Sequence, residues 1–211
     1  MHVSDGILSG PVITAGFIGT VAIAALTLRK MDLEEIPKIS VATSAFFVAS
    51  LIHIPVGPSS VHLLLNGLVG VILGWRAFPA IMLGIILQAI LFGHGGVTVI
   101  GVNTLMLGGG ALAGFMVWQM RSRFTFNKNE LVFGFLGAAT GTIVSGIILS
   151  VALITTGEAF TATAGLVLAY HIPVMVIEGL VAAACVSFLM KVKPELLPGF
   201  VPKKKLVENS D

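Results

Sequence analysis

The sequence predicts an all-α membrane protein, a bundle of seven transmembrane helices with its N-terminus outside and its C-terminus inside. Apolar residues make up 56% of the 211 residues and charged residues only 10%, whereas a soluble domain carries roughly 25% charged residues. The mean hydropathy of +1.02 agrees with this class. The apolar segments are separated by Gly, Pro or charged residues and show no alternating pattern, which favours helices over a β-barrel.

Each predicted span is a long apolar segment. The segments are residues 7–28, 39–56, 60–75, 77–93, 97–120, 131–155 and 163–190. The third and fourth are short for a bilayer, which needs about 17–25 residues, and polar residues or breakers interrupt them. Transporters often build binding sites at such interrupted spans. Residues 1–190 are therefore assigned to the transmembrane domain and residues 191–211 to a polar cytoplasmic tail.

The orientation follows from the basic residues. With the N-terminus outside, all 12 Lys and Arg residues fall in segments on the inside. These segments are residues 29–38, Arg76, residues 121–130 and the chain from Lys191 onward. An excess of Lys and Arg on the cytoplasmic side is the rule for membrane proteins. The same topology places all five histidines outside or in the outer half of a span.

Small residues recur at four-residue spacing within the apolar segments. The pairs are Gly70 and Gly74, Gly110 and Gly114, and Gly137 and Gly141. This spacing lets two helices approach closely. Packing within the bundle is the expected role, and docking against another membrane subunit is the alternative.

The first two residues, Met1 and His2, can chelate a metal ion. The amine of Met1 and the backbone nitrogen of His2 close a five-membered ring, and that nitrogen and Nδ1 of His2 close a six-membered ring. The result is a planar clamp of three nitrogens. Planar nitrogen ligation is typical of Ni(II) or Cu(II), and Co(II) can be held in the same way.

A planar site needs a fourth donor, and a second imidazole is the natural one. The candidates are His53, His62, His94 and His171. His62 is the first choice, because it follows a turn in GPSSVHLLLNG, where nearby backbone or hydroxyl groups can orient its ring.

Four stretches in order resemble the nickel/cobalt substrate-binding membrane proteins of energy-coupling-factor (ECF) transporters, the CbiM/NikM family. They are MHVSDGILSGP, GPSSVHLLLNG, ILQAILFGHGGVTVIGVNTLMLG and HIPVMVIEGLV. The resemblance covers residues 1–190 and departs from the family pattern at His94 and Asn66. It implies that the ion is held by Met1, His2 and His62.

The resemblance also implies a complex in a prokaryotic cell membrane. Its other parts would be a transmembrane coupling subunit (CbiQ/NikQ-like), two ABC ATPases (CbiO/NikO-like) and an optional small accessory subunit (CbiN-like), surrounded by membrane lipids. Co²⁺ or Ni²⁺ would be the transported ligand, for cobalamin biosynthesis or nickel enzymes. Neither a permanent cofactor nor a nucleic acid partner is expected.

Further polar residues are candidates for supporting roles. Asp5, His53, His94 and Asn103 are candidates for supporting a ligand from outside or lining the access path of the ion. Asp5 is alternatively the N-cap of the first span. Gln88, His171 and Glu178 are candidates for coupling or for structural hydrogen bonds between helices.

Two other classes of protein remain as alternatives. The sequence contains no phosphate-binding loop and no HExxH pair, so we expect a transport subunit and not an enzyme. An integral-membrane metalloenzyme would need an open metal position and a nearby general base. A binding subunit for an organic vitamin would need aromatic residues in its outer cavity, but both Trp residues lie near the predicted inner face.

Overall fold

The protein is described by a computed structural model over residues 2–29, 31–51, 53–56 and 59–200, with the backbone alone for residues 53–56 and 59–62. The helices are α1 (Gly10–Leu28), α2 (Ile36–Leu51), α3 (Asn66–Leu73), α4 (Ala77–Phe92), α5 (Ile100–Met120), α6 (Asn129–Thr156) and α7 (Thr161–Val192). Two short strands, β1 (His53–Val56) and β2 (Ser59–His62), form an antiparallel pair between α2 and α3.

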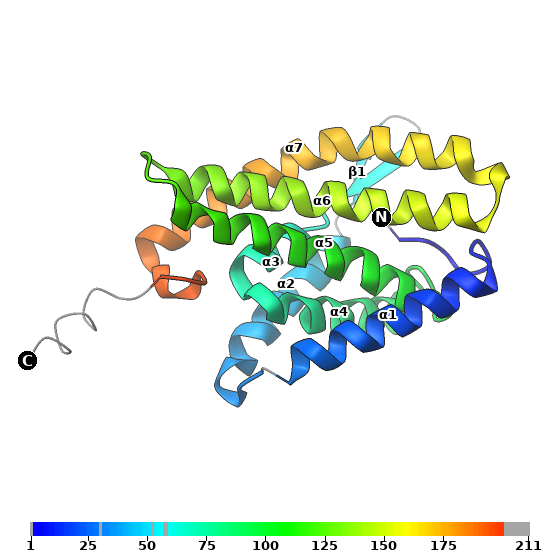
Figure 1. The fold of residues 1–211 in the computed structure, drawn as a ribbon, viewed down its shortest axis with the longest axis horizontal. Coiled ribbons are helices and arrows are strands. Elements are labelled where there is room, and N and C mark those ends of the chain that lie inside the picture. Colours follow the sequence, from blue (N-terminus) through cyan, green and yellow to red (C-terminus); the bar gives the residue numbers. More distant parts are fainter. Residues whose placement is uncertain (1, 30, 52, 57–58, 201–211) are drawn as a thin grey trace, which may run out of the picture.

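Helix α5 lies at the centre of the bundle (Figure 1). It packs against α1, α3, α4 and α6, while α7 runs back along α6 and α2 packs on α4. Side chains of the α3–α4 segment and of α5 are mostly buried, whereas α1 and α7 leave most of theirs exposed. The exposed faces of α1 and α7 are apolar, as expected of surfaces that meet lipid.

The prediction of a bundle of apolar helices is confirmed, and five segments of the described chain are long and apolar enough to cross a membrane. They are α1, α5, α6, the α3–α4 segment Asn66–Phe92, and the segment Glu158–Val192 that contains α7. The prediction of seven separate spans is not confirmed by this count. With 16 residues, α2 is short for a helix that crosses a bilayer.

The predicted second and third spans, residues 39–56 and 60–75, are wrong in their helical extent. The strand pair occupies the ends of both segments, and its register places His53 opposite His62. Pro55, Gly57 and Pro58 lie in this stretch. Proline lacks the backbone N–H that a helix interior needs and disfavours helical backbone in the residue before it, so a continuous helix cannot form there.

The paired small residues pack helices of this chain against one another. A Cβ atom on Gly114 would lie 2.6 Å from the carbonyl oxygen of Gly137, and one on Gly70 would overlap the carbonyl of Ala111. A Cβ on Gly141 would lie 2.7 Å from the Cα of Gly67. The expected role in bundle packing is therefore confirmed for α3, α5 and α6.

The turns that carry basic residues gather at one end of the bundle, on the left in Figure 1. Contacts tie these turns together. Arg76 forms an ion pair with Glu35, and Nζ of Lys38 donates to the carbonyl of Leu196 at 2.6 Å. Residues 194–200, predicted as part of the polar tail, pack against this end, with Leu197 only 1% exposed.

Candidate metal centre

The stretch before α1 folds back into the bundle and is held there by Asn103 of α5 (Figure 1). The backbone N–H of Val3 donates to Oδ1 of Asn103 at 3.0 Å, and Nδ2 of Asn103 donates to the carbonyl of Val3 at 3.1 Å. Val3 is 4% exposed and Asn103 1%. The side-chain amide thus satisfies both backbone groups of Val3 where water is excluded, which fixes the residue that follows His2.

Asp5 provides a second attachment for the same stretch. Its N–H donates to the carbonyl of Gly95 at 2.7 Å. Its carboxylate accepts from the N–H of Thr98 at 3.1 Å and from the Thr98 hydroxyl at 2.5 Å. The N-cap position of α1 is Ser9, not Asp5. The N-cap interpretation of Asp5 is therefore wrong, and the alternative, that Asp5 orients the terminal loop, agrees with these contacts.

The GHGG turn between α4 and α5 forms the surface on which the terminal stretch lies. Gly95 and Gly96 have positive φ values of 78° and 108°, which favour glycine. A Cβ atom on Gly95 would lie 2.6 Å from Nδ2 of Asn103, and one on Gly96 would overlap the carboxylate of Asp5. Both glycines are therefore required by the close approach of the terminal stretch as well as by their backbone angles.

The rings of His2 and His94 are stacked. Their centroids are 6.4 Å apart and their planes differ by 7°. His94 also contacts Phe92, with ring centroids 6.2 Å apart. Two of the five predicted outer histidines therefore meet at the GHGG turn, 92 positions apart in the sequence.

His62 lies at the end of β2, and Glu178 of α7 anchors the chain just after it. The carboxylate of Glu178 accepts a hydrogen bond from the N–H of Leu64. The N–H of Leu65 lies 3.0 Å and 2.9 Å from its two oxygens. Glu178 is fully buried. The two N–H groups that it accepts from belong to the last two residues before α3. The side chains of His53 and His62 lie outside the described residues.

Asn66 fixes the first turn of α3 in the same region. Its Nδ2 donates to the hydroxyl of Ser145 at 2.8 Å and to the carbonyl of Leu107 at 3.1 Å. The side chain thus connects α3 with α5 and α6 where Asn66 is fully buried. Together with Glu178, it holds the segment that follows His62 from three neighbouring helices.

Gln88 and His171 make structural hydrogen bonds. Nε2 of Gln88 donates to the hydroxyl of Ser50 at 2.7 Å, which joins α4 to α2. Nδ1 of His171 lies 2.7 Å from the carbonyl of Val167, one turn earlier in α7. A Cβ on Gly146 of α6 would lie 2.9 Å from the His171 ring, so the ring fills the space between α6 and α7.

The proposed ligand set itself is not tested by these contacts. Met1 and the side chain of His62 lie outside the described residues, and within the described part of the chain no group of three His, Cys, Asp or Glu side chains could hold a metal ion. The ligand set Met1, His2 and His62 therefore stays a prediction. Thr98, Val3 and Ser145 were not predicted from the sequence, because ordinary Thr, Val and Ser residues carry no local signal of such contacts.

Comparison with known proteins gives consistent results. Residues 2–196 match the family model of the cobalt uptake substrate-specific transmembrane region, CbiM. A Haemophilus influenzae protein that is named for metal transport is 35% identical over 93% of this chain and 97% of its own length. The cobalt transport protein CbiM of Clostridium tetani is 32% identical over 90% of this chain and 85% of its own.

A nickel relative and a solved structure extend the comparison. The fused nickel transport protein NikMN of Rhodobacter capsulatus is 34% identical over 56% of this chain and 35% of its own length. The crystal structure of a transition metal transporter superposes with a TM-score of 0.73 at 19% identity, over 91% of this chain and 93% of that one. At this identity the superposition shows the shared fold. From the family match and the relatives, the chain belongs to the CbiM family of multi-pass membrane proteins for cobalt and nickel transport.

Proposed function

We propose that this protein is the substrate-capture component of an ECF importer and that it binds Co²⁺ or Ni²⁺ at its outer face. The observation that carries the proposal is the double hydrogen bond between Asn103 and Val3. A terminal stretch normally frays. Here it is held inside the bundle, next to residue 2, where a chelating histidine stands.

The ion is bound by the amine of Met1, the backbone nitrogen and Nδ1 of His2, and the ring of His62. Val3, fixed by Asn103, sets the position of the backbone next to His2, and the Glu178 anchor sets the position of the segment after His62. Both halves of the site are thus attached to rigid helices. Such support limits the ordering that metal binding must otherwise impose on its ligands.

His94 lies beside the proposed site, and Asp5 holds the turn that carries His94. The imidazole of His94 faces that of His2 in parallel, so it screens the metal-binding face of His2 from solvent or receives the ion on its way in. Asp5 holds the GHGG turn to the terminal stretch through Thr98. The two residues act on the access path, and the ion itself is held by the nitrogens of the first two residues.

Uphill import takes its energy from partner subunits. The sequence has no nucleotide-binding motif, so a coupling subunit and two ABC ATPases of the ECF type supply the energy and topple the loaded bundle inward. The gathering of the basic turns at the end of the bundle where α5 finishes supports a cytoplasmic placement of that end. The terminal stretch and the GHGG turn then belong to the outer side.

The test is a measurement of metal in purified protein that starts with an authentic Met1. We expect about one Ni²⁺ or Co²⁺ per chain after dialysis, and a planar Ni(II) absorption band. His2→Ala removes the imidazole and leaves the fold intact, so its metal content should fall to background. Exposed Glu158→Ala, in the turn between α6 and α7, is the control and should retain the metal. Equal metal content in all three proteins would refute the site.

A further inference from the structure

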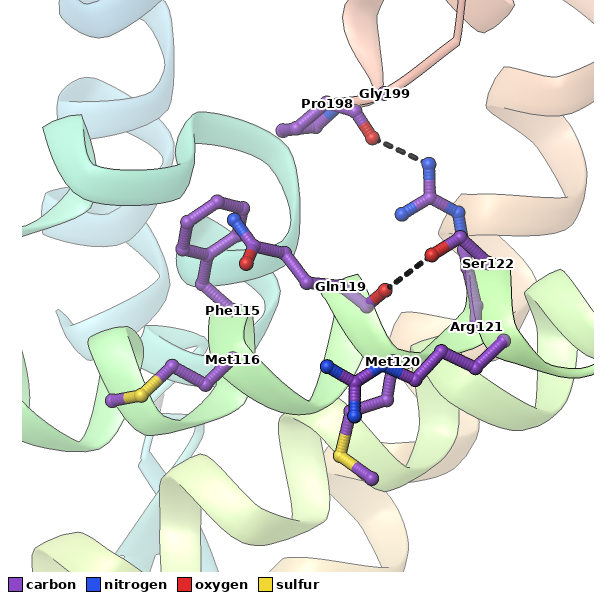
Figure 2. A pocket seen from close by; sticks show the side chains of 9 residues that line it. Phe115, Met116, Gln119, Met120, Arg121, Ser122, Pro198 and Gly199 are labelled. Carbon is purple, nitrogen blue, oxygen red and sulfur yellow. Dashed lines mark hydrogen bonds between the residues drawn. The ribbon is translucent and has the colours of Figure 1, made fainter.

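A pocket of about 410 Å³ lies at the far end of α5 from the GHGG turn. Its walls are the last two turns of α5, the 3₁₀ turn Arg121–Arg123 and the residues Pro198 and Gly199 (Figure 2). Along α5, the pocket residues Phe115–Met120 lie 12 to 17 positions beyond Asn103, so roughly 18–25 Å separates this pocket from the proposed metal centre. The pocket is therefore a feature distinct from that centre.

One wall of the pocket is tightly built around Arg121. Its Nη2 donates to the carbonyl of Pro198 at 2.6 Å, and its Nη1 to the carbonyl of Trp118 at 3.2 Å. The indole N–H of Trp118 donates to the same Pro198 carbonyl at 3.2 Å. The guanidinium lies 4.1 Å from the Trp118 ring centroid. These contacts fix Pro198 and Gly199 beside α5.

The pocket is positively charged. Arg121 and Arg123 line it, and none of its lining residues is acidic. The carbonyl groups that Arg121 contacts accept hydrogen bonds and leave its charge in place. Arg123 is exposed and makes no ion pair or hydrogen bond within the described part of the chain. The pocket thus presents two cations, one of them available to a ligand.

The same pocket has an apolar side that continues onto the surface of α5. Phe115, Met116 and Met120 line it, as Figure 2 shows for the two methionine side chains. Met116 is 50% exposed and Met120 43%. The candidate span that contains α5 ends at Arg123, so the two arginines lie at the end of this span and Met116 lies one to two helical turns inside it.

We propose that this pocket binds an anionic phospholipid, with its phosphate at Arg123, the charge of buried Arg121 close by, and an acyl chain along Met116 and Met120. A simple anion would contact the basic side of the pocket and not its apolar side, whereas a phospholipid contacts both. Basic pockets at the cytoplasmic ends of membrane helices bind anionic headgroups in this manner.

The experiment measures lipid retained by the full-length protein. Protein delipidated in mild detergent is incubated with phosphatidylglycerol or phosphatidylcholine and examined by native mass spectrometry. We expect one phosphatidylglycerol molecule to be retained and phosphatidylcholine to be lost. Arg123→Gln should lower the retained phosphatidylglycerol about fivefold, the effect of roughly one basic side chain at an anionic surface. The control is Arg29→Gln, at an exposed arginine outside this pocket, and it should change retention less than twofold.

Three other outcomes would overturn the proposal. Equal retention of both lipids would remove the role of the anionic headgroup. Equal losses in Arg123→Gln and Arg29→Gln would indicate general surface charge. Displacement of the bound lipid by millimolar inorganic phosphate, with phosphate alone protecting the protein from heat to the same extent, would identify the ligand as free phosphate.

Discussion

The side-chain amide of Asn103 pairs with both backbone groups of Val3, as one strand of a β-ladder pairs with the next. The pairing is buried and joins residues that are 100 positions apart. Its consequence is that the stretch carrying His2 has a defined position before any metal binds.

Replacing Asn103 with Leu should weaken metal binding more than it damages the fold. The substitution leaves the N–H and C=O of Val3 without partners, which costs about 1–3 kcal/mol. If the terminal stretch then leaves the bundle, this corresponds to a roughly 5- to 150-fold weaker affinity for Ni²⁺. Isothermal titration calorimetry on the purified variant measures the change.

Gln88→Leu is the matched control for Asn103→Leu. Gln88 is equally buried and its hydrogen bond joins α4 to α2, so this variant loses stability without releasing the terminal stretch. Its Ni²⁺ affinity should stay within about twofold of the wild type. Similar losses of affinity in both variants would mean that stability alone, and not the Val3 contact, governs binding.

Substitutions at two glycines of the GHGG turn distinguish the effect of backbone strain from the effect of losing contact with the terminal stretch. Gly93 and Gly96 both have positive φ, but a Cβ on Gly93 meets nothing within 4 Å, whereas one on Gly96 would overlap the Asp5 carboxylate. Gly93→Ala should cost about 1–2 kcal/mol of stability and preserve Ni²⁺ binding. Gly96→Ala should also release Asp5 from Thr98 and weaken Ni²⁺ binding at least fivefold.

Thermal unfolding and metal titration of both alanine variants provide the test. The prediction requires the two variants to differ in affinity, because only one of them disturbs the terminal stretch. Identical Ni²⁺ affinities would show that the contact between Asp5 and the turn has no influence on the metal centre.

The sequence predicted the helices well where long apolar runs are uninterrupted. Helices α4 to α7 begin and end within about three residues of the predicted segments, because a bilayer-length apolar run has few alternatives to a helix. The strand pair was missed because Ile54, Val56 and Val61 continue the apolar runs on either side. Pro55, Gly57 and Pro58 were the local signal that the helix had to stop there.

The sequence singled out polar residues around the proposed metal centre, but it did not predict their contacts. Asp5, His94, Asn103 and Glu178 were identified as polar residues in unusual places. Their partners lie far away in the sequence: Asp5 binds Thr98, 93 positions later, and Glu178 binds Leu65, 113 positions earlier. Such pairs depend on how helices pack, and no local pattern encodes that. Residues 194–200 were assigned to the tail for the same reason, since only the folded bundle offers Leu197 a buried position.

Glu178→Gln should weaken Ni²⁺ binding because Glu178 positions the segment that follows His62. Glutamine keeps the size of the side chain, but it offers one acceptor oxygen in place of two and directs an N–H₂ group toward the amides of Leu64 and Leu65. A buried N–H left without an acceptor costs about 1–3 kcal/mol, so we expect a roughly 10-fold weaker affinity. The planar Ni(II) absorption band should shift as well, because a displaced His62 changes the ligand field.

The spectrum distinguishes positioning from a general structural role. Glu158→Gln changes the same residue type in the turn between α6 and α7 and should alter neither affinity nor spectrum. A Glu178→Gln protein that unfolds at a lower temperature but binds Ni²⁺ with the wild-type affinity and spectrum would limit Glu178 to a structural role.

Extending the N-terminus should abolish the proposed chelate while leaving the bundle folded. The length of the extension decides the result. One added residue would create a new amine, two amide nitrogens and the His2 ring in sequence, which is itself a planar four-nitrogen set. Four added residues without histidine move the amine too far from Nδ1 of His2 to share an ion, so Ni²⁺ affinity should fall at least 100-fold.

The contacts of Val3 with Asn103 and of Asp5 with Thr98 do not involve the amine. The four-residue extension should therefore leave the melting temperature of the metal-free protein within about 2 °C of the wild type. Removing the extension with a protease that restores Met1 should recover Ni²⁺ binding in the same sample. Full affinity in the extended protein would exclude the terminal amine as a ligand and leave the imidazoles alone to hold the ion.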